Sequence, residues 1–270
     1  MPRTMVRSRE EKGIGLALSG GGCRSVAHLG MMQALIEQGV SFSQVAGSSA
    51  GAIIGALYCR GISPKEILKI LSALNYLSIF RPALNWQALL NLEKVIDFLT
   101  IHLPEDDFSS LNIPLVVVAT DLNKGKIKYF KKGQLWRPLI ASCSIPVVFS
   151  PVKINGTAYV DGGILNNLPI EPLKKKCNYV IGLHCNPIGK IRVSGNWKKQ
   201  LERSLLLTIS SRDKLKIKKM DLFWEPPGLS SYHVFDFNRL DKIFDIGYAY
   251  AMHQLSKGQS KFLINSYVRN

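Results

Sequence analysis

The chain has 270 residues, of which 46% are hydrophobic, so it is long enough to bury the core of one α/β domain. It carries 35 Lys and Arg against 19 Asp and Glu, and the formal charge of +16 favours an anionic partner: a phospholipid surface, a nucleic acid or an acidic substrate. The five cysteines show neither C-x-x-C pairs nor zinc-ligand spacing, which argues against a disulfide framework and a structural metal and favours a reducing cytoplasm.

The N-terminal residues 1–12 are basic and contain no apolar stretch of the kind that a secretory signal has. We therefore expect a flexible extension over 1–12, followed by a single domain over 13–270. The longest apolar runs, such as 115–120 and 180–183, are far shorter than the roughly 18 residues of a membrane span. These observations predict a cytoplasmic protein whose contact with a membrane, if it has one, is peripheral.

In the first 60 residues, short apolar runs alternate with glycine turns and with segments whose pattern predicts a helix. The expected elements are a strand over 14–18, a glycine turn over 19–22, a helix to 38, a strand over 42–46, a second glycine turn over 47–51 and a helix to 59. This order is a βαβα unit, so the two strands should be parallel.

The remaining chain supplies further helices and strands. Residues 64–103 read as helices that begin at Pro64 after Ser63, and they could be a core-facing pair or a lid over an apolar pocket. The expected strands are 114–119, the more exposed 125–130, a hairpin of 151–154 and 157–160 around Asn155-Gly156, the buried 180–184, and 222–225 as a last central strand. The sheet should be mainly parallel and mixed at its margin.

The most basic segment, 197–220, has lysines and arginines around leucines and isoleucine at helical spacing. A basic amphipathic helix is typical of a protein that lies on an anionic membrane. An ordinary surface helix with a solvated charged face fits the same pattern, and both interpretations stay open. A nucleic-acid role would rest on charge alone, because no binding motif accompanies it, so we expect no nucleic acid.

The segment Gly47-Ser48-Ser49-Ala50-Gly51 has the pattern G-x-S-x-G. It follows a predicted apolar strand and precedes a predicted helix, which is the strand–turn–helix context of a nucleophile elbow. The small neighbours allow the sharp turn that lifts the Ser49 hydroxyl clear of the sheet. The sequence thus nominates Ser49 as a nucleophile.

The first glycine turn, Gly20-Gly21-Gly22, ends the neighbouring parallel strand, where bare backbone N–H groups can point at a developing oxyanion. A dinucleotide-binding fingerprint is the competing interpretation, but Ser25 stands where its third glycine should be. A phosphate-binding P-loop is excluded because no Gly-Lys-Ser/Thr follows the glycines.

Such a nucleophile needs a base. None of the five histidines lies in a sequence context that identifies it as the base of a catalytic triad. Asp161 ends an apolar run and is followed by Gly162-Gly163, so its carboxylate stands at a strand end. Taken alone, an Asp-Gly-Gly string would be an ordinary turn.

Together, Gly20-Gly-Gly-x-Arg24, Gly47-x-Ser49-x-Gly51 and Asp161-Gly-Gly163, with 141–146 and 166–169 around them, resemble the patatin-like phospholipase family, and most of all its short bacterial members. The resemblance covers about residues 13–186 in the expected order. It implies a three-layer α/β/α sandwich with a mainly parallel central sheet. It also implies a Ser-Asp dyad without histidine and cleavage of acyl esters in phospholipids or lysophospholipids, with no cofactor and no metal.

The resemblance also implies roles for single residues. Ser49 would attack the ester carbonyl, Asp161 would accept its proton, and Gly47, Gly51, Gly162 and Gly163 would support their turns. The oxyanion would lie at the backbone N–H groups of Gly20, Gly21, Gly22 and Cys23, while Arg24 would either meet a substrate phosphate or hold the glycine turn. Ser25 and Val147 stand where glycine is usual, which keeps open a catalytically weak lipid-binding or regulatory protein on the same fold.

Overall fold

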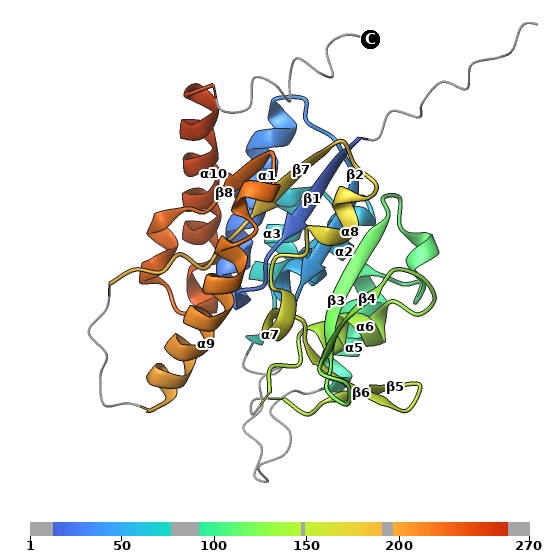
Figure 1. Cartoon of the computed structure of the whole chain (residues 1–270). Coiled ribbons are helices and arrows are strands. Elements are labelled where there is room, and N and C mark those ends of the chain that lie inside the picture. Colours follow the sequence, from blue (N-terminus) through green and yellow to red (C-terminus); the bar gives the residue numbers. More distant parts are fainter. Residues whose placement is uncertain (1–12, 77–91, 147–148, 191–196, 259–270) are drawn as a thin grey trace, which may run out of the picture.

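The computed structural model describes residues 13–76, 92–146, 149–190 and 197–258, and in these residues eight strands form one sheet (Figure 1). The strands are β1 Ile14–Leu18, β2 Phe42–Ser48, β3 Leu115–Asp121, β4 Lys126–Phe130, β5 Val152–Ile154, β6 Thr157–Asp161, β7 Tyr179–Leu183 and β8 Leu222–Trp224. Their order across the sheet is β5-β6-β3-β2-β1-β7-β8, and β4 pairs with β3 as well.

Helices lie on both faces of the sheet, with α7, α8 and α9 in front of it in Figure 1. The α-helices are α1 Val26–Glu37, α2 Ala50–Cys59, α3 Pro64–Ser72, α5 Leu92–His102, α6 Trp136–Ser142, α7 Gly163–Asn166, α8 Glu171–Lys174, α9 Trp197–Lys214 and α10 Leu240–Ser256. Short 3-10 helices are η1 Gly22–Ser25, η2 Phe108–Ser110, η3 Ile217–Lys219, η4 Pro227–Ser231 and η5 Phe237–Arg239. The predicted α/β class with helices around a mixed sheet is confirmed.

Strand pairing follows the prediction at the centre and at the margin. β1 pairs in parallel with β2 and β7, and β2 pairs in parallel with β3. The pairs β3–β4, β3–β6 and β5–β6 are antiparallel. Because β1 and β2 are parallel neighbours, the turns that follow them meet at one edge of the sheet.

Successive side chains of β1 point to opposite faces of the sheet and pack into different apolar clusters. Leu16 and Leu18 are fully buried in the large apolar cluster that includes side chains of α1, α2 and α10. Ala17, on the opposite face, is buried in a second cluster with Leu168 and Leu173, before and within α8. A strand with apolar residues on both faces is what a sheet covered on both sides requires.

Two local turn predictions are confirmed. The hairpin between β5 and β6 turns at Asn155 and Gly156, whose φ angles of 48° and 78° suit a two-residue type I′ turn. Helix α3 begins at Pro64, and Ser63 and Glu66 form a reciprocal capping box before it. The choice between a core-facing pair and a lid for 64–103 depends partly on 77–91, which lie outside the described residues. The proposed extension over 1–12 lies outside them too, so the domain division stays a prediction.

The prediction that 222–225 is a central strand is wrong. Among the described strands β8 pairs with β7 alone, and it ends the sheet. Its Leu222 and Trp224 are nevertheless buried, because both belong to the large apolar cluster that includes side chains of α1 and α10. A covered edge strand and a central strand have the same apolar pattern, so sequence could not separate them.

The prediction of one basic helix as far as residue 220 is also wrong, because α9 ends at Lys214. The chain then turns, with the Lys216 N–H donating to the Asp213 carbonyl at 2.9 Å, before η3 leads into β8. Within the described segments, no helix has both the length and the apolar content that crossing a bilayer requires.

Candidate active site

Ser49 lies in the sharp turn between β2 and α2. Its φ of 53° and ψ of −132° are a conformation that residues other than glycine rarely adopt. The flanking glycines make this turn possible: a Cβ on Gly47 would lie 2.6 Å from the Gly51 carbonyl oxygen, and one on Gly51 would lie 2.5 Å from the Ser19 carbonyl oxygen. The strand–turn–helix geometry predicted for G-x-S-x-G is therefore present.

The strained turn is held by a hydroxyl from another element. The Ser49 N–H donates to Oγ of Ser142, at the end of α6, at 2.8 Å. Ser142 is fully buried, so this hydrogen bond is screened little by water. Sequence reasoning assigned no role to Ser142, and the only available signal was its place in the string 141–146.

Ser49 and Asp161 are hydrogen-bonded to each other. The Ser49 hydroxyl donates to Oδ2 of Asp161 at 2.7 Å, and the Gly163 N–H donates to Oδ1 of the same carboxylate at 2.6 Å. Asp161 ends β6, and its own N–H and carbonyl bond Ser144 and Thr120. The exposed fractions of Ser49 and Asp161 are 9% and 6%, so both are nearly sequestered from solvent.

Burial makes Asp161 a better base than an exposed aspartate. Desolvation raises the pKa of Asp161 from 3.8 to about 6, and the hydrogen bonds from Ser49 and Gly163 offset part of that rise. Above about pH 6 the carboxylate is ionised and can accept the proton of a hydroxyl that already points at it.

The glycine turn after β1 lies directly against Ser49. A Cβ on Gly20 would stand 2.8 Å from the Ser49 Cβ. The Gly20 N–H donates to Oδ1 of Asn167 at 3.0 Å, and the Cys23 N–H donates to the Val234 carbonyl at 2.9 Å. In the described part of the chain no acceptor is recorded for the N–H groups of Gly21 and Gly22.

Arg24 is 5% exposed, and its side chain points into the protein. Its Nε donates to the Tyr232 carbonyl at 2.7 Å, and its terminal nitrogen contacts the same oxygen. Of the two roles considered for Arg24, this geometry favours holding the loop. Ser25 is fully buried, and its hydroxyl donates to the Ser19 carbonyl at 3.4 Å, so it is accommodated in η1; Val147 lies outside the described residues.

Two of the histidines are buried, and neither bonds Ser49. His28 contacts the Ser19 carbonyl through Nε2 at 2.9 Å, and His184 lies between two carboxylates. No group of three or more His, Cys, Asp or Glu side chains in the described segments is placed to hold a metal ion.

Comparison with known proteins agrees with this geometry. The family model of patatin-like phospholipase matches residues 16–174, a span that includes the glycine turn, Ser49 and Asp161. An uncharacterized NTE family protein of Mycobacterium tuberculosis is 32% identical in an alignment of 209 positions, gaps included, that covers 74% of this chain and 58% of that protein. Lysophospholipase NTE1 of Meyerozyma guilliermondii is 25% identical in an alignment of 288 positions, gaps included, that covers 92% of this chain and 19% of that protein.

Among solved structures, VipD from Legionella pneumophila is similar to this chain with a TM-score of 0.59 at 17% identity. The similarity covers 96% of this chain and 68% of VipD, and at this identity it supports the fold alone. The chain spans little more than half the length of the mycobacterial relatives that it matches.

Proposed function

The chain belongs to the patatin-like phospholipase family, and on that basis we propose that it is a serine acyl hydrolase that cleaves carboxylic esters of phospholipids or lysophospholipids. The single observation that carries the proposal is the hydrogen bond of 2.7 Å from the Ser49 hydroxyl to a buried Asp161 carboxylate. A serine in a strained elbow, bonded to a base of raised pKa, is the arrangement that nucleophilic catalysis requires.

In this mechanism Ser49 Oγ attacks the ester carbonyl carbon while its proton passes to Asp161. Asp161 then protonates the departing alcohol oxygen, which leaves the acyl group on Ser49. In the second step Asp161 takes a proton from water, the hydroxide attacks the acyl carbon, and Ser49 Oγ recovers the proton as the fatty acid leaves. In each step Asp161 is the group that accepts and returns the proton, and Ser49 is the group that forms or releases the acyl bond.

The tetrahedral intermediates need N–H donors for their negative oxygen. Of the four residues nominated from the sequence, Gly20 and Cys23 already donate to Asn167 and Val234. We therefore narrow the proposed oxyanion hole to the N–H groups of Gly21 and Gly22, which stand next to Gly20 in the turn against Ser49.

The test is labelling of the purified protein with a fluorophosphonate, followed by peptide mapping. We expect one adduct on Ser49, its absence in Ser49→Ala, and strongly slowed labelling in Asp161→Asn. Hydrolysis of lysophosphatidylcholine, diacylphosphatidylcholine and a triacylglycerol is then compared. Lysophospholipid is the first substrate to try, because several relatives are named lysophospholipases. A folded protein that binds lipid but gives no adduct would support the lipid-binding alternative instead.

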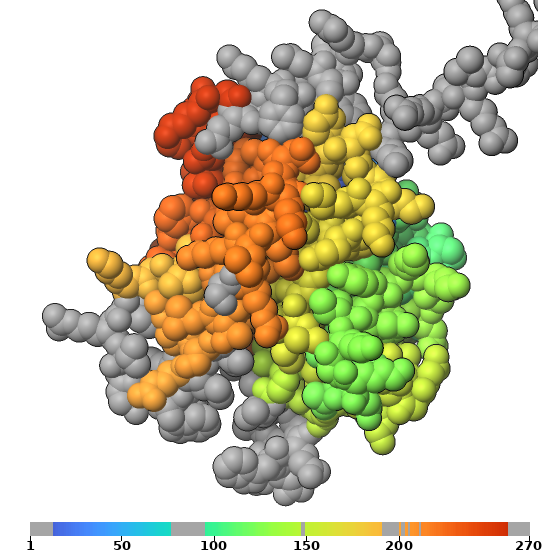
Figure 2. Space-filling view, in the orientation of Figure 1, coloured from blue at the N-terminus to red at the C-terminus, as the bar shows by residue number. Residues whose placement is uncertain are grey.

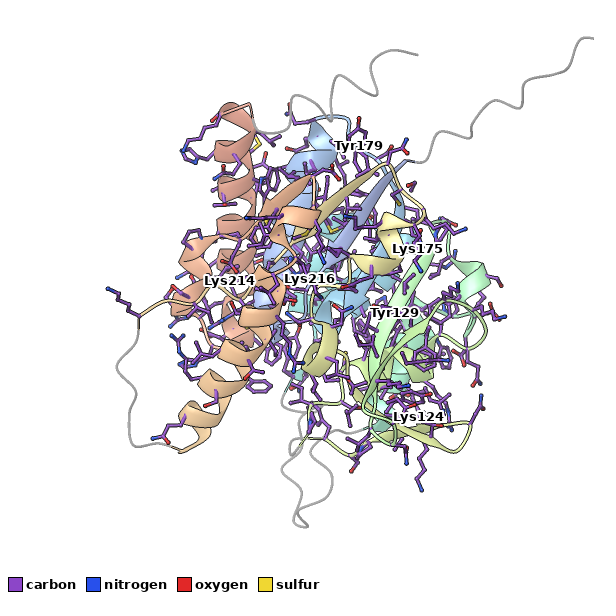
Figure 3. The ribbon with its side chains drawn as sticks, in the orientation of Figure 1. Lys124, Tyr129, Lys175, Tyr179, Lys214 and Lys216 are labelled. Atoms are coloured by element: carbon purple, nitrogen blue, oxygen red, sulfur yellow. The ribbon has the colours of Figure 1, made fainter. Side chains whose placement is uncertain are left out.

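We also propose that the enzyme works at an anionic membrane surface. Leu215 follows α9 and is 78% exposed, and its neighbours in the chain include the exposed Lys214, at the end of α9, and Lys218 and Lys219, in η3. Figure 2 shows this orange part of the surface adjoining α8, in yellow, and Figure 3 places Lys214, Lys216 and Lys175 on the same side of the molecule. An apolar side chain among lysines suits the boundary between headgroups and acyl chains.

Membrane binding is measured by co-sedimentation with vesicles of phosphatidylcholine alone or with phosphatidylglycerol. We expect binding to the anionic vesicles that weakens with salt. Lys214→Glu removes one positive charge and adds one negative charge, so at about 1 kcal/mol per charge near the surface it should weaken binding about 30-fold. Lys257→Glu, at the end of α10, is the matched control and should bind like the unchanged protein. Equal binding of both variants would mean that α9 has an ordinary solvated surface.

A further inference from the structure

His184 is a buried titratable residue that takes no part in the proposed Ser49–Asp161 dyad. It follows β7, its side chain is 2% exposed, and a carboxylate faces each ring nitrogen. Nδ1 lies 2.5 Å from Oε1 of Glu225, and Nε2 lies 3.2 Å from Oδ2 of Asp213. When both carboxyl groups are ionised their oxygens only accept hydrogen bonds, so each ring nitrogen then carries a proton and the ring is an imidazolium.

The carboxylate of Asp213 that contacts His184 also contacts Asn167. The side chain of Asp213, in the last turn of α9, is 3% exposed, and its Oδ2 also accepts from Nδ2 of Asn167 at 3.2 Å. An asparagine amide can face either way, but here its NH₂ group must meet the carboxylate. The oxygen Oδ1 is thereby turned toward Gly20, whose N–H it accepts at 3.0 Å.

Gly20 is thus held on both sides of its backbone. Its N–H donates to Asn167, and its carbonyl accepts from Nδ2 of Asn186 at 2.6 Å. The two following N–H groups, of Gly21 and Gly22, take their direction from this fixed peptide. A shift of Gly20 would move them relative to Ser49.

The neighbouring Asn166 is held by the same elements. Its Nδ2 donates to Oη of Tyr129 at 2.9 Å, and its Oδ1 accepts from Nζ of Lys216, which lies 3.6 Å from Oδ1 of Asp213. Tyr129 and Lys216 are labelled in Figure 3, on β4 and between α9 and η3. The segment that follows Asp161 is therefore held to α9 by Asn167 and to the turn after α9 by Asn166.

We propose that His184 is a positioning residue: as a buried imidazolium it holds Asp213, which orients Asn167 and so aims the Gly20–Gly22 turn at the oxyanion. This inference rests on the proposed hydrolase function. Loss of the His184 proton would free Asp213 to move and would lower kcat, with little effect on KM, because the turn acts on the intermediate more than on the bound ester.

The charges around His184 are consistent with this proton. Burial lowers the pKa of His184, but the two carboxylates outweigh burial and raise it to about 9. Burial lowers the pKa of His28, on α1, to about 4, so it adds no second charge. The titratable groups that surround the pair are Asp213 and Lys216 from the α9 end, Glu225 after β8, Cys185 after β7, His28 from α1 and Tyr250 from α10.

The test compares kcat with the His184 titration in the same protein. A soluble p-nitrophenyl ester is assayed from pH 5 to 10 in the unchanged protein and in Glu225→Gln, and long-range ¹H–¹⁵N NMR follows the His184 nitrogens. The glutamine side chain keeps an acceptor oxygen and removes the charge, so we expect the His184 pKa and the alkaline fall in kcat to move down together. An alkaline fall that stays in place while the His184 pKa moves would overturn the proposal, as would a neutral ring at pH 7.

His184→Gln and Asn167→Ala test the chain of contacts. We expect each to lower kcat by about tenfold, and the double variant to lose no more than Asn167→Ala alone, because both act through one contact. Losses that multiply would overturn the proposal; His102→Gln, on α5, is the histidine control. If His184→Gln does not fold, the Glu225→Gln comparison still decides. Fluorophosphonate labelling of Ser49 tests the hydrolase function separately, so failure of one inference is distinguishable from failure of the other.

Discussion

Replacing Asp161 with asparagine should make the protein more stable while it stops catalysis. The pKa of Asp161 rises from 3.8 in the unfolded chain to about 6 in the folded protein, because burial disfavours its charge. The ionised carboxylate therefore costs the folded state about 3 kcal/mol above pH 6. Asparagine has no charge, and its oxygen can still accept from the Gly163 N–H.

The sign depends on pH. Below 3.8 Asp161 is protonated in both states and costs nothing, and the cost develops as pH rises from 3.8 to about 6. The free energy of unfolding of Asp161→Asn should therefore exceed that of the unchanged protein by about 2–3 kcal/mol at pH 8, and by about 0.5 kcal/mol at pH 4.

Urea unfolding at pH 4, 6 and 8 measures this difference. Ser49→Ala is the matched variant of opposite sign: it removes a hydrogen bond that lowers the Asp161 pKa, so it should destabilise the protein at pH 8 and not at pH 4. In the Asp161→Asn background no carboxylate titrates at this position, so there the effect of Ser49→Ala should not depend on pH. An Asp161→Asn protein that is less stable than the unchanged one at pH 8, or that gains equally at every pH, would refute the assigned burial of this charge.

The same geometry leads to three further expectations. The kcat/KM for a soluble ester should rise with pH through about 6 as Asp161 ionises, and a flat profile between pH 5 and 8 would contradict its role as base. Ser142→Ala leaves the Ser49 N–H without its acceptor, so urea unfolding should show a loss of about 1–3 kcal/mol together with a lower kcat. Ser144→Ala, whose hydroxyl donates to the Ile140 carbonyl, should leave kcat unchanged. Gly51→Ala should prevent folding or lower Tm sharply, because the added Cβ meets backbone oxygen at 2.5 Å, whereas Gly39→Ala meets nothing within 4 Å and should cost about 1 kcal/mol for its positive φ.

The local features of this molecule could be predicted from short strings of residues. The elbow at Ser49, the helix start at Pro64 and the turn at Asn155-Gly156 follow from backbone preferences that act over about five residues. The parallel pairing of β1 and β2 follows from the helix between them. The roles assigned to Ser49, Asp161 and the glycine turn stay predictions, now with a geometry that allows them to be tested.

What the sequence could not decide depends on contacts between distant residues. Ser49 and Asp161 are 112 positions apart, and the Asn167 contact with Gly20 spans 147. The edge place of β8 also depends on which distant strands pair with it, since burial alone makes its residues apolar.

The sequence by itself determined the turns, the strand–helix alternation and the candidate nucleophile, because these depend on the conformational range of a few neighbouring residues. Only the tertiary structure decided which N–H groups of the glycine turn donate to other residues, and that a histidine without a catalytic setting lies buried between two carboxylates. Hydrogen-bond partners and the charge state of a buried group are properties of the packed chain, because desolvation and distance set them and neither exists before the chain folds.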